Sequence, residues 1–260
     1  MKRYLRILRL FWSAALAAEM EYRINFLVAA LTSIVGLAGS IFALTLFYSK
    51  AGTLNGWTWA QALVVMGLFT ILEGFSSTCL SPNLSRIVQH VQQGTLDFVL
   101  LKPVDSQFWL STRNFSPWGL PNVLFGLAIL IFAGRRIGAT PMDYLIALLP
   151  VLCGLTILYS IWFVIGATSV WFVKVWNATE VLRSYLEAGR YPVAFYPAAF
   201  RVFFTFIIPV AFLTTVPAES FLGHPRPRPL LAAVSLAAAL FTTARLFWHF
   251  ALRYYTSASS

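Results

Sequence analysis

Charged residues are scarce in this chain of 260 residues, of which 11% are Asp, Glu, Lys or Arg, against roughly 25% in an average soluble domain. Histidine and cysteine are scarcer still, with three and two residues. His90, His224 and His249 lie far apart and lack the spacing of metal ligands, so we expect no metal site. Cys79 and Cys153 lie inside apolar runs, which argues against a disulfide framework and makes packing their simplest role.

The sequence also lacks the motifs of an enzyme. It contains no Gly-x-x-x-x-Gly-Lys loop, the motif that cradles nucleotide phosphates, and no Ser/His pair or pair of aspartates falls inside the apolar runs. We therefore expect no catalytic residue and no cofactor bound to this chain.

Long apolar runs occupy most of the sequence, which is 59% hydrophobic with a mean hydropathy of +0.75. A soluble domain cannot bury this much apolar surface, and a helix that crosses the hydrocarbon core needs about 20 apolar residues. The fifth run below is shorter, begins with an arginine and contains a proline, and we include it because the charges then fall correctly. The six predicted spans are Ile24–Tyr48, Thr58–Leu80, Trp118–Gly134, Tyr144–Val173, Arg201–Val216 and Leu230–Ala251.

The positive charges orient these spans. With six spans and a cytoplasmic N-terminus, 14 Lys and Arg residues fall on the cytoplasmic side and 5 on the outer side, as the positive-inside rule requires. Both termini are then cytoplasmic, and the net charge of +10 faces anionic lipid rather than nucleic acid. The sequence therefore predicts an all-α integral membrane protein with a single transmembrane domain over residues 1–260.

Two amphipathic helices are predicted at the cytoplasmic surface. In residues 1–22, arginines recur every third position from Arg3 to Arg9 and form one polar arc beside an apolar face, as in helices that lie in the membrane interface. Residues 177–192 are predicted to form the second helix, which ends at Gly189.

On the outer side, residues 217–229 are predicted to be a loop. They hold four prolines and one glycine, which exclude a regular helix through the whole segment. Its first part, Pro217–Leu222, is a candidate re-entrant segment. Irregular backbone at membrane depth is tolerated only against protein or water.

Residues 81–116, between the second and third spans, are too polar to cross the membrane. Ser81 and Pro82 are predicted to cap and begin a helix with one apolar face. Gly94 is its predicted left-handed end. Because such a segment has no core of its own, we expect this cytoplasmic elbow to bind another protein.

A second short helix of the elbow is expected directly after Gly94. Thr95 is its predicted cap, and Asp97 favours the positive end of the helix dipole. Lys102, which precedes Pro103, is predicted to close the helix.

At these residues the chain resembles a known family, the permease subunits of type-2 ATP-binding-cassette (ABC) exporters, in their branch of six-span proteins with roughly 260 residues. The resemblance extends over the whole chain in the order and length of the spans. It is carried by three motifs, which are EYRINFL at Glu21–Leu27, GTLDFVLLKPVDSQF at Gly94–Phe108, and RYPVAFYPAAFRVFFTFIIPVAFLTTVPAESFLG at Arg190–Gly223.

The resemblance implies the partners. The elbow corresponds to the family's coupling helix, which sits in a cleft of a separate ATPase subunit that binds ATP and Mg. A second permease, identical or paralogous, completes the transporter in a bacterial inner membrane, and a hydrophobic or amphipathic substrate moves outward. The elbow residues expected to take part in coupling to the ATPase are Arg86, Gln89, Gln93, Gly94, Thr95, Asp97 and Lys102.

Glu73 is the one clearly intramembrane acid, about 22 Å into the second span at 1.5 Å per residue. Two interpretations stay open for it: a structural hydrogen bond or snorkelling to the surface, and a counter-charge for a cationic, hydrophobic substrate. Trp162 and Phe163 sit in the middle of a span, where core packing is their default role, and they are further candidates for the substrate path. A secondary transporter or channel is the alternative function, but that class usually carries several ionisable groups at mid-membrane.

Overall fold

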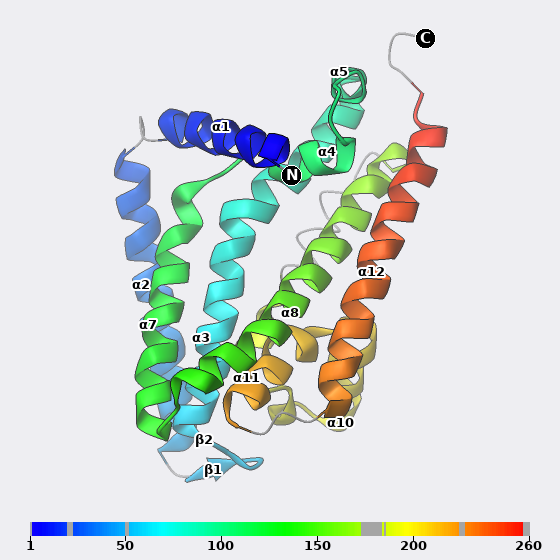
Figure 1. Ribbon diagram of the computed structural model, residues 1–260. Helices are drawn as coiled ribbons and strands as arrows, with labels where there is room; N and C mark the ends of the chain where they lie inside the picture. The colour runs from blue at the N-terminus through cyan, green and yellow to red at the C-terminus, as the bar shows by residue number, and fades with distance from the viewer. Residues whose placement is uncertain are drawn as a thin grey trace.

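The computed structural model describes residues 2–19, 23–49, 52–172, 184, 186–223 and 227–256. The described chain is almost entirely helical, and its strands are β1 (Thr53–Leu54) and β2 (Trp57–Thr58). Figure 1 shows a bundle of long helices in which α1 (Lys2–Glu19) lies across one end and β1 and β2 lie at the other. We call these the elbow end and the hairpin end. The predicted all-α class is confirmed.

Five helical segments are long and apolar enough to cross a membrane, and they confirm five of the six predicted spans. All five run along the length of the bundle (Figure 1). They are α2 (Arg23–Tyr48), α3 (Trp59–Phe75) with its continuation, α7 (Leu120–Ile137) preceded by η3 (Pro117–Gly119), α8 (Pro141–Ala167) followed by η4 (Thr168–Val170), and α12 (Pro227–Tyr254).

Glycines allow α3 and α7 to approach until their backbones touch. A Cβ atom built on Gly74 would lie 2.6 Å from the backbone nitrogen of Val123, and one built on Gly126 would lie 2.8 Å from the carbonyl oxygen of Gly67. Lipid tails are as apolar as the side chains, so van der Waals contact between small residues is what holds such helices together. These two helices form one half of the bundle.

The other half is the pair α8 and α12. Trp248 of α12 is fully buried and packs edge-on against Phe163 of α8, with 5.6 Å between ring centroids. Small residues recur along the buried face of α12 at intervals of four and seven, which keeps them on one side of a helix. These residues are Ala233, Ala237, Ala244 and Ala251.

Between α8 and α12 the chain forms a bent pair of short helical segments near the hairpin end. Ala198–Ile207 and Ala211–Phe221 meet at 79°, and the break contains Pro209, which lacks the N–H group that would continue a helix. The predicted span over Arg201–Val216 therefore falls on a bent pair, and the described helices give five spans, or six if this pair counts as one broken span. The first segment consists of α10 (Ala198–Val202) and η7 (Phe203–Ile207), and the second of η8 (Ala211–Thr215) and α11 (Val216–Phe221). The short turn η6 (Val193–Phe195) precedes the pair.

The predicted outer loop at residues 217–229 is also more regular than expected. Pro217 lies in the first turn of α11, and α12 begins at Pro227. Proline fits a first helical turn because the N–H group it lacks has no partner there. Residues 224–226 lie outside the described residues.

The predicted second cytoplasmic helix is described only at its end, because residues 173–183 and 185 lie outside the described residues. That end is η5 (Glu187–Arg190), a 3-10 turn. It lies inside the bundle rather than at the elbow end, since a Cβ atom built on Gly189 would lie 2.9 Å from the side chain of Val210.

For this described end alone, the predicted cytoplasmic position was wrong, and Arg190 shows why. Its guanidinium group donates a hydrogen bond to the hydroxyl of Ser40 on α2 at 2.6 Å and lies 5.2 Å from the ring centroid of Phe69 on α3. The charge that suggested a solvated surface therefore has its partners between helices.

A two-residue turn joins β1 to β2 and fixes the hairpin end. Asn55 and Gly56 both have positive φ, 47° and 83°, as a type I′ turn requires. The side-chain amide of Asn55 donates to the carbonyl of Ala194 at 2.9 Å. This bond ties the α2–α3 connection to the bent helical pair.

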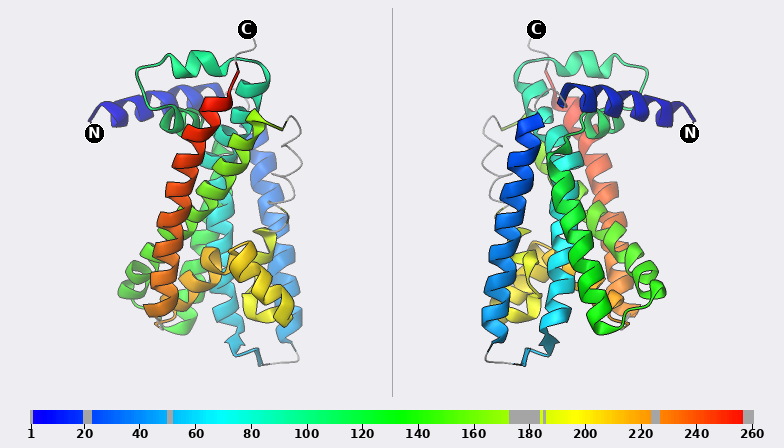
Figure 2. Two further views of the ribbon diagram at one scale, coloured as in Figure 1. Left: turned by 90° about the vertical axis from the view of Figure 1, so that its right-hand side faces the viewer. Right: turned by 90° about the vertical axis from the view of Figure 1, so that its left-hand side faces the viewer.

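Helix α1 lies across the long helices, as the predicted interfacial helix would (Figure 2). Its aromatic face packs on the segment that follows α5. Tyr4 stacks edge-on with Phe108 at 4.8 Å between ring centroids, and the guanidinium of Arg113 lies 4.7 Å from the ring centroid of Phe11. The N-terminal helix is thus attached to the elbow.

Candidate functional site: the elbow and a membrane cavity

The elbow, residues 81–116, contains α4 (Ser81–Gln92), α5 (Leu96–Leu100) and α6 (Ser106–Thr112). Helix α4 continues α3 through the π-helical segment η2 (Ser76–Leu80), so Ser81 is not a cap, and that prediction was wrong. Pro82 leaves the carbonyl of Thr78 without its helical donor. The backbone N–H of Ser116, where the elbow ends, donates to that carbonyl at 3.0 Å. The elbow therefore starts and ends at one point of the bundle.

Gly94 ends α4 with φ of 66°, which confirms the predicted left-handed end. Thr95 occupies the cap position of α5, but its side chain makes no capping hydrogen bond. Its hydroxyl is instead 2.7 Å from Nδ1 of His90. This contact closes the bend between α4 and α5, a role that the spacing in the sequence did not predict.

The predicted coupling residues divide into two groups. Gly94, Thr95 and Asp97 are half-buried at the bend. The remaining four are exposed, as an interaction surface requires: Arg86, Gln89, Gln93 and Lys102.

The outermost part of the elbow also exposes apolar side chains that the sequence analysis missed. Phe98 and Leu101 are 69% and 81% exposed, whereas Leu96 and Val99 are buried against the rest of the elbow. We call Phe98 and Leu101 the apolar tip. The signal was present in the run LDFVLL, which places apolar residues on every side of a helix that lies outside the predicted spans.

An ion pair joins the elbow to α12. Asp105 caps α6 by accepting the backbone N–H of Phe108 at 2.8 Å, and it binds Arg245 through both carboxylate oxygens, at 2.9 and 2.5 Å. The hydrogen bond from Arg245 is the main reason why the pKa of Asp105 lies below its usual value. The pair is therefore ionised at neutral pH, and its planar, two-point geometry fixes orientation as well as distance.

A second set of hydrogen bonds joins α6 to α8. The amide of Gln107 donates to the hydroxyl of Tyr159 at 3.0 Å, and that hydroxyl is 2.8 Å from the hydroxyl of Ser111. In addition, the indole N–H of Trp248 on α12 donates to the hydroxyl of Ser106 at 3.0 Å. A displacement of the elbow would thus act directly on both helices of one half of the bundle.

Sequence reasoning missed this connection although part of its signal was visible. Arg245 is a charged residue inside an apolar run, and an ionisable group there indicates a functional site with a partner. It was counted only as a topology signal. Its partner Asp105 is 140 positions away, so no local pattern relates the two.

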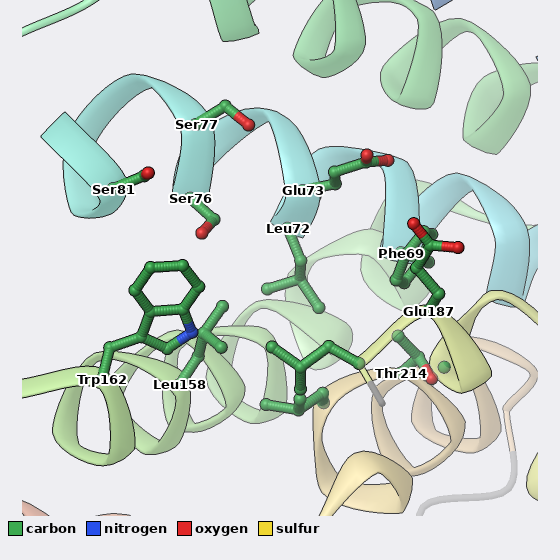
Figure 3. A pocket seen from close by; sticks show the side chains of 13 residues that line it. Phe69, Leu72, Glu73, Ser76, Ser77, Ser81, Leu158, Trp162, Glu187 and Thr214 are labelled. Carbon is green, nitrogen blue, oxygen red and sulfur yellow. The ribbon is translucent and has the colours of Figure 1, made fainter. Parts of the chain in front are cut away.

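A cavity of about 60 Å³ lies between α3, α8, η5 and η8 (Figure 3). Of the three predicted substrate-path residues, Glu73 and Trp162 line this cavity, and Phe163 does not, because its ring packs on Trp248. Glu187 of η5, which the sequence analysis placed in the cytoplasm, lines the same wall. The cavity thus brings together two acids that are 114 positions apart in the chain.

These features define a multi-pass helical membrane protein with a helical elbow at one end of its spans. A family model described as ABC-2 family transporter protein matches residues 34–259, so the chain belongs to this family and is a permease of an ABC system. The predicted resemblance is confirmed. Comparisons with curated proteins and with solved structures gave no match.

Proposed function

We propose that the chain is the membrane subunit of an ABC exporter and moves a hydrophobic or amphipathic substrate outward. ATP hydrolysis then takes place on a separate ATPase subunit, which holds ATP and Mg. The observation that supports this proposal best is the elbow, which exposes an apolar tip and polar side chains and is bonded to α8 and α12.

In this mechanism the elbow converts movement of the ATPase into movement of helices. The apolar tip and the exposed residues Arg86 and Lys102 contact the ATPase. The pair Asp105–Arg245 carries the displacement to α12, and Gln107 carries it to α8 through Tyr159. Because α3 and α7 hold together through glycine contacts, α8 and α12 shift against them and open the path to the opposite side.

We further propose that two such permeases, identical or paralogous, form the transporter in a bacterial inner membrane. The elbow end is cytoplasmic, and it contains α1 and the end of α12, so both termini face the ATPase (Figure 1). The positive charge of the N-terminal helix favours the same orientation.

Co-purification tests this function. A tagged permease expressed in its native host should retain an ABC ATPase, and the complex in proteoliposomes should hydrolyse ATP. Truncation of the apolar tip should release the ATPase and leave the permease monodisperse. A permease that transports with an ion gradient and without any ATPase would support the secondary-transporter alternative instead.

A further inference from the structure

A groove of about 790 Å³ lies beneath α1, between η2, α6, α8 and α12. Ligand-sized clefts in proteins have volumes of about 300–1,000 Å³, and protein interiors leave few voids larger than a water molecule. Leu152 of α8 and Phe241 of α12 line the groove and are 50% and 46% exposed on helices that are apolar enough to span a membrane. The groove therefore opens towards the lipid bilayer.

The lining of the groove changes from apolar to polar along the bundle. Helices α8 and α12 both run from the hairpin end to the elbow end (Figure 1). At 1.5 Å per residue, Leu152 lies about 10 Å deeper than Tyr159, and Phe241 lies about 6 Å deeper than Arg245. Apolar side chains thus line the deeper part, and hydrogen-bonding side chains line the part beneath α1. A lipid in the leaflet at the elbow end has its chains and its polar part in the same order.

The charges on the described wall of the groove balance each other. Among the described residues that line it, Asp105 and Arg245 are the charged ones, and they form one ion pair. A free ammonium or carboxylate group would find no net opposite charge there, and burial of an unpaired charge is costly. The wall therefore favours an uncharged group.

Arg245 retains hydrogen-bonding capacity that the described residues do not use. A guanidinium group carries five N–H donors. Two of them bind the carboxylate of Asp105, and a third, on Nη1, binds the side-chain oxygen of Gln107 at 3.2 Å. The other two, on Nε and Nη2, have no acceptor among the described residues, and the side chain is 39% exposed. They are available to an acceptor that enters the groove.

Several other polar side chains of this wall already have partners. The amide of Asn83 donates to the carbonyl oxygen of Asn114 at 2.7 Å, and the hydroxyl of Tyr159 accepts from Gln107 at 3.0 Å. A ligand that fits the groove therefore has an uncharged acceptor for Arg245 and apolar groups elsewhere. The ester carbonyls and acyl chains of a glycerolipid supply this combination.

We propose that the groove binds the diacylglycerol part of one glycerophospholipid from the leaflet at the elbow end. An acyl chain lies beside Leu152 and Phe241, and an ester carbonyl accepts a hydrogen bond from Arg245. The site is independent of the proposed exporter function, since it requires only that the spans lie in a bilayer. Because Arg245 also holds the elbow through Asp105, the bound lipid becomes part of the contact between the elbow and α12.

Native mass spectrometry of the purified permease in detergent tests the proposal. The permease is titrated with dioleoylphosphatidylcholine and with its ether-linked analogue, which has the same headgroup and chain length and lacks the two carbonyl groups. Oleate is the comparator with a free carboxylate. We expect one saturable diacyl lipid per chain, binding of the ether analogue that is weaker by about tenfold, and no displacement by an equal concentration of oleate.

Two variants locate the site. Leu152→Trp narrows the groove at a half-exposed position and should weaken binding of the diacyl lipid by about tenfold or more. Leu149→Trp is the matched control, because Leu149 is also 50% exposed on α8 and does not line the groove. Arg245→Gln should lower the affinity for the diacyl lipid to that of the ether analogue and leave binding of the ether analogue unchanged, a selective loss that unfolding would not produce. Size-exclusion chromatography verifies the fold of each variant.

Three results would overturn the proposal. Equal affinity for the diacyl and ether lipids would remove the contact with Arg245, and equal affinity in Leu152→Trp and Leu149→Trp would mean annular lipid only. A dimeric permease that binds no lipid would show that a second copy covers the groove. Retention of the ATPase is measured on separate preparations: lipid binding without an ATPase refutes the exporter alone, and an ATPase without lipid binding refutes the lipid site alone.

Discussion

At the scale of single residues, the contact between Asp105 and Arg245 is the most informative in the molecule. The two side chains are 30% and 39% exposed, and ion pairs with that much solvent contribute little to stability, about 0–1 kcal/mol. Their value for stability is therefore small. Their position between the elbow and α12 gives them a mechanical role, in which two parallel hydrogen bonds keep the elbow in register with the helix.

A double-mutant cycle tests this role. Asp105→Asn keeps the helix cap and removes the charge, and Arg245→Gln removes the partner. Each variant should retain the ATPase and lose several-fold in substrate-stimulated ATP hydrolysis, while the double variant should be no worse than the poorer single one, because both changes remove the same interaction. Arg253→Gln, an exposed arginine on the same helix, is the control. Additive losses would show that the two residues act separately.

Gly94 matters because of its backbone conformation and not because of a side-chain contact. An L-residue in its left-handed conformation costs about 1–2 kcal/mol, and asparagine tolerates that conformation better than other residues. Gly94→Val should therefore distort the bend and weaken co-purification of the ATPase, whereas Gly94→Asn should preserve it. If both variants retain the ATPase and transport normally, the angle between α4 and α5 has no part in coupling.

At the scale of elements, the elbow is a bent helical segment whose outer surface is more apolar than its sequence suggested. Phe98 and Leu101 face away from the bundle, and large apolar side chains that fill pockets of a partner usually dominate the binding free energy. Phe98→Ala and Leu101→Ala should each lower retention of the ATPase by about tenfold or more. Neither should destabilise the permease, because neither side chain is buried.

Phe42→Ala is the matched control for the apolar tip. Phe42 is similarly exposed, at 65%, but lies on α2 within a span. Its replacement should leave retention of the ATPase unchanged in a pull-down with tagged permease. An equal loss in all three variants would mean that hydrophobic exposure in general, and not the tip, governs the assay.

Much of the arrangement of helices can be predicted from neighbouring residues in the sequence, but two features could not. Hydropathy located five spans because each is an uninterrupted apolar run, and Gly94 was identified because a helix end depends on neighbours in sequence. The bend at Pro209 was not predicted, although the proline was noted, because a straight span and a bent pair have the same apolar composition. The inward position of Arg190 was missed because its partner Ser40 lies on a distant segment.

In the candidate site, too, some residues could be predicted from the sequence and others could not. Glu73 and Trp162 were selected because a charged or aromatic residue at mid-span is visible in one helix. Glu187 was assigned to the cytoplasm because it falls within the predicted cytoplasmic helix over residues 177–192. Only the three-dimensional arrangement places it on the wall of the same cavity as Glu73.

At the scale of the whole molecule, the bundle consists of two helix pairs, α3 with α7 and α8 with α12, and open space separates parts of them. A groove of about 790 Å³ under α1 separates η2 from α8 and α12, and Phe75, Tyr159 and Arg245 line it. The cavity with Glu73 lies between α3 and α8, beside η5 and η8. The groove and the cavity leave few direct contacts between the two helix pairs. One pair can therefore move against the other, as alternating access requires.

The orientation of the molecule decides whether this mechanism is possible, because an ATPase reaches the elbow only from the cytoplasm. The elbow end carries α1, α4 and the end of α12, and the hairpin end carries β1 (Figure 1). We expect Thr53→Cys in β1 to react with a membrane-impermeant maleimide in intact cells. Gln93→Cys at the end of α4 and Thr256→Cys after α12 should react only after permeabilisation. Unmodified protein, with Cys79 and Cys153 half-buried or buried, measures the background. Labelling of Gln93→Cys in intact cells would place the elbow outside, where no ATP is hydrolysed, and the coupling mechanism would fail whatever the binding data show.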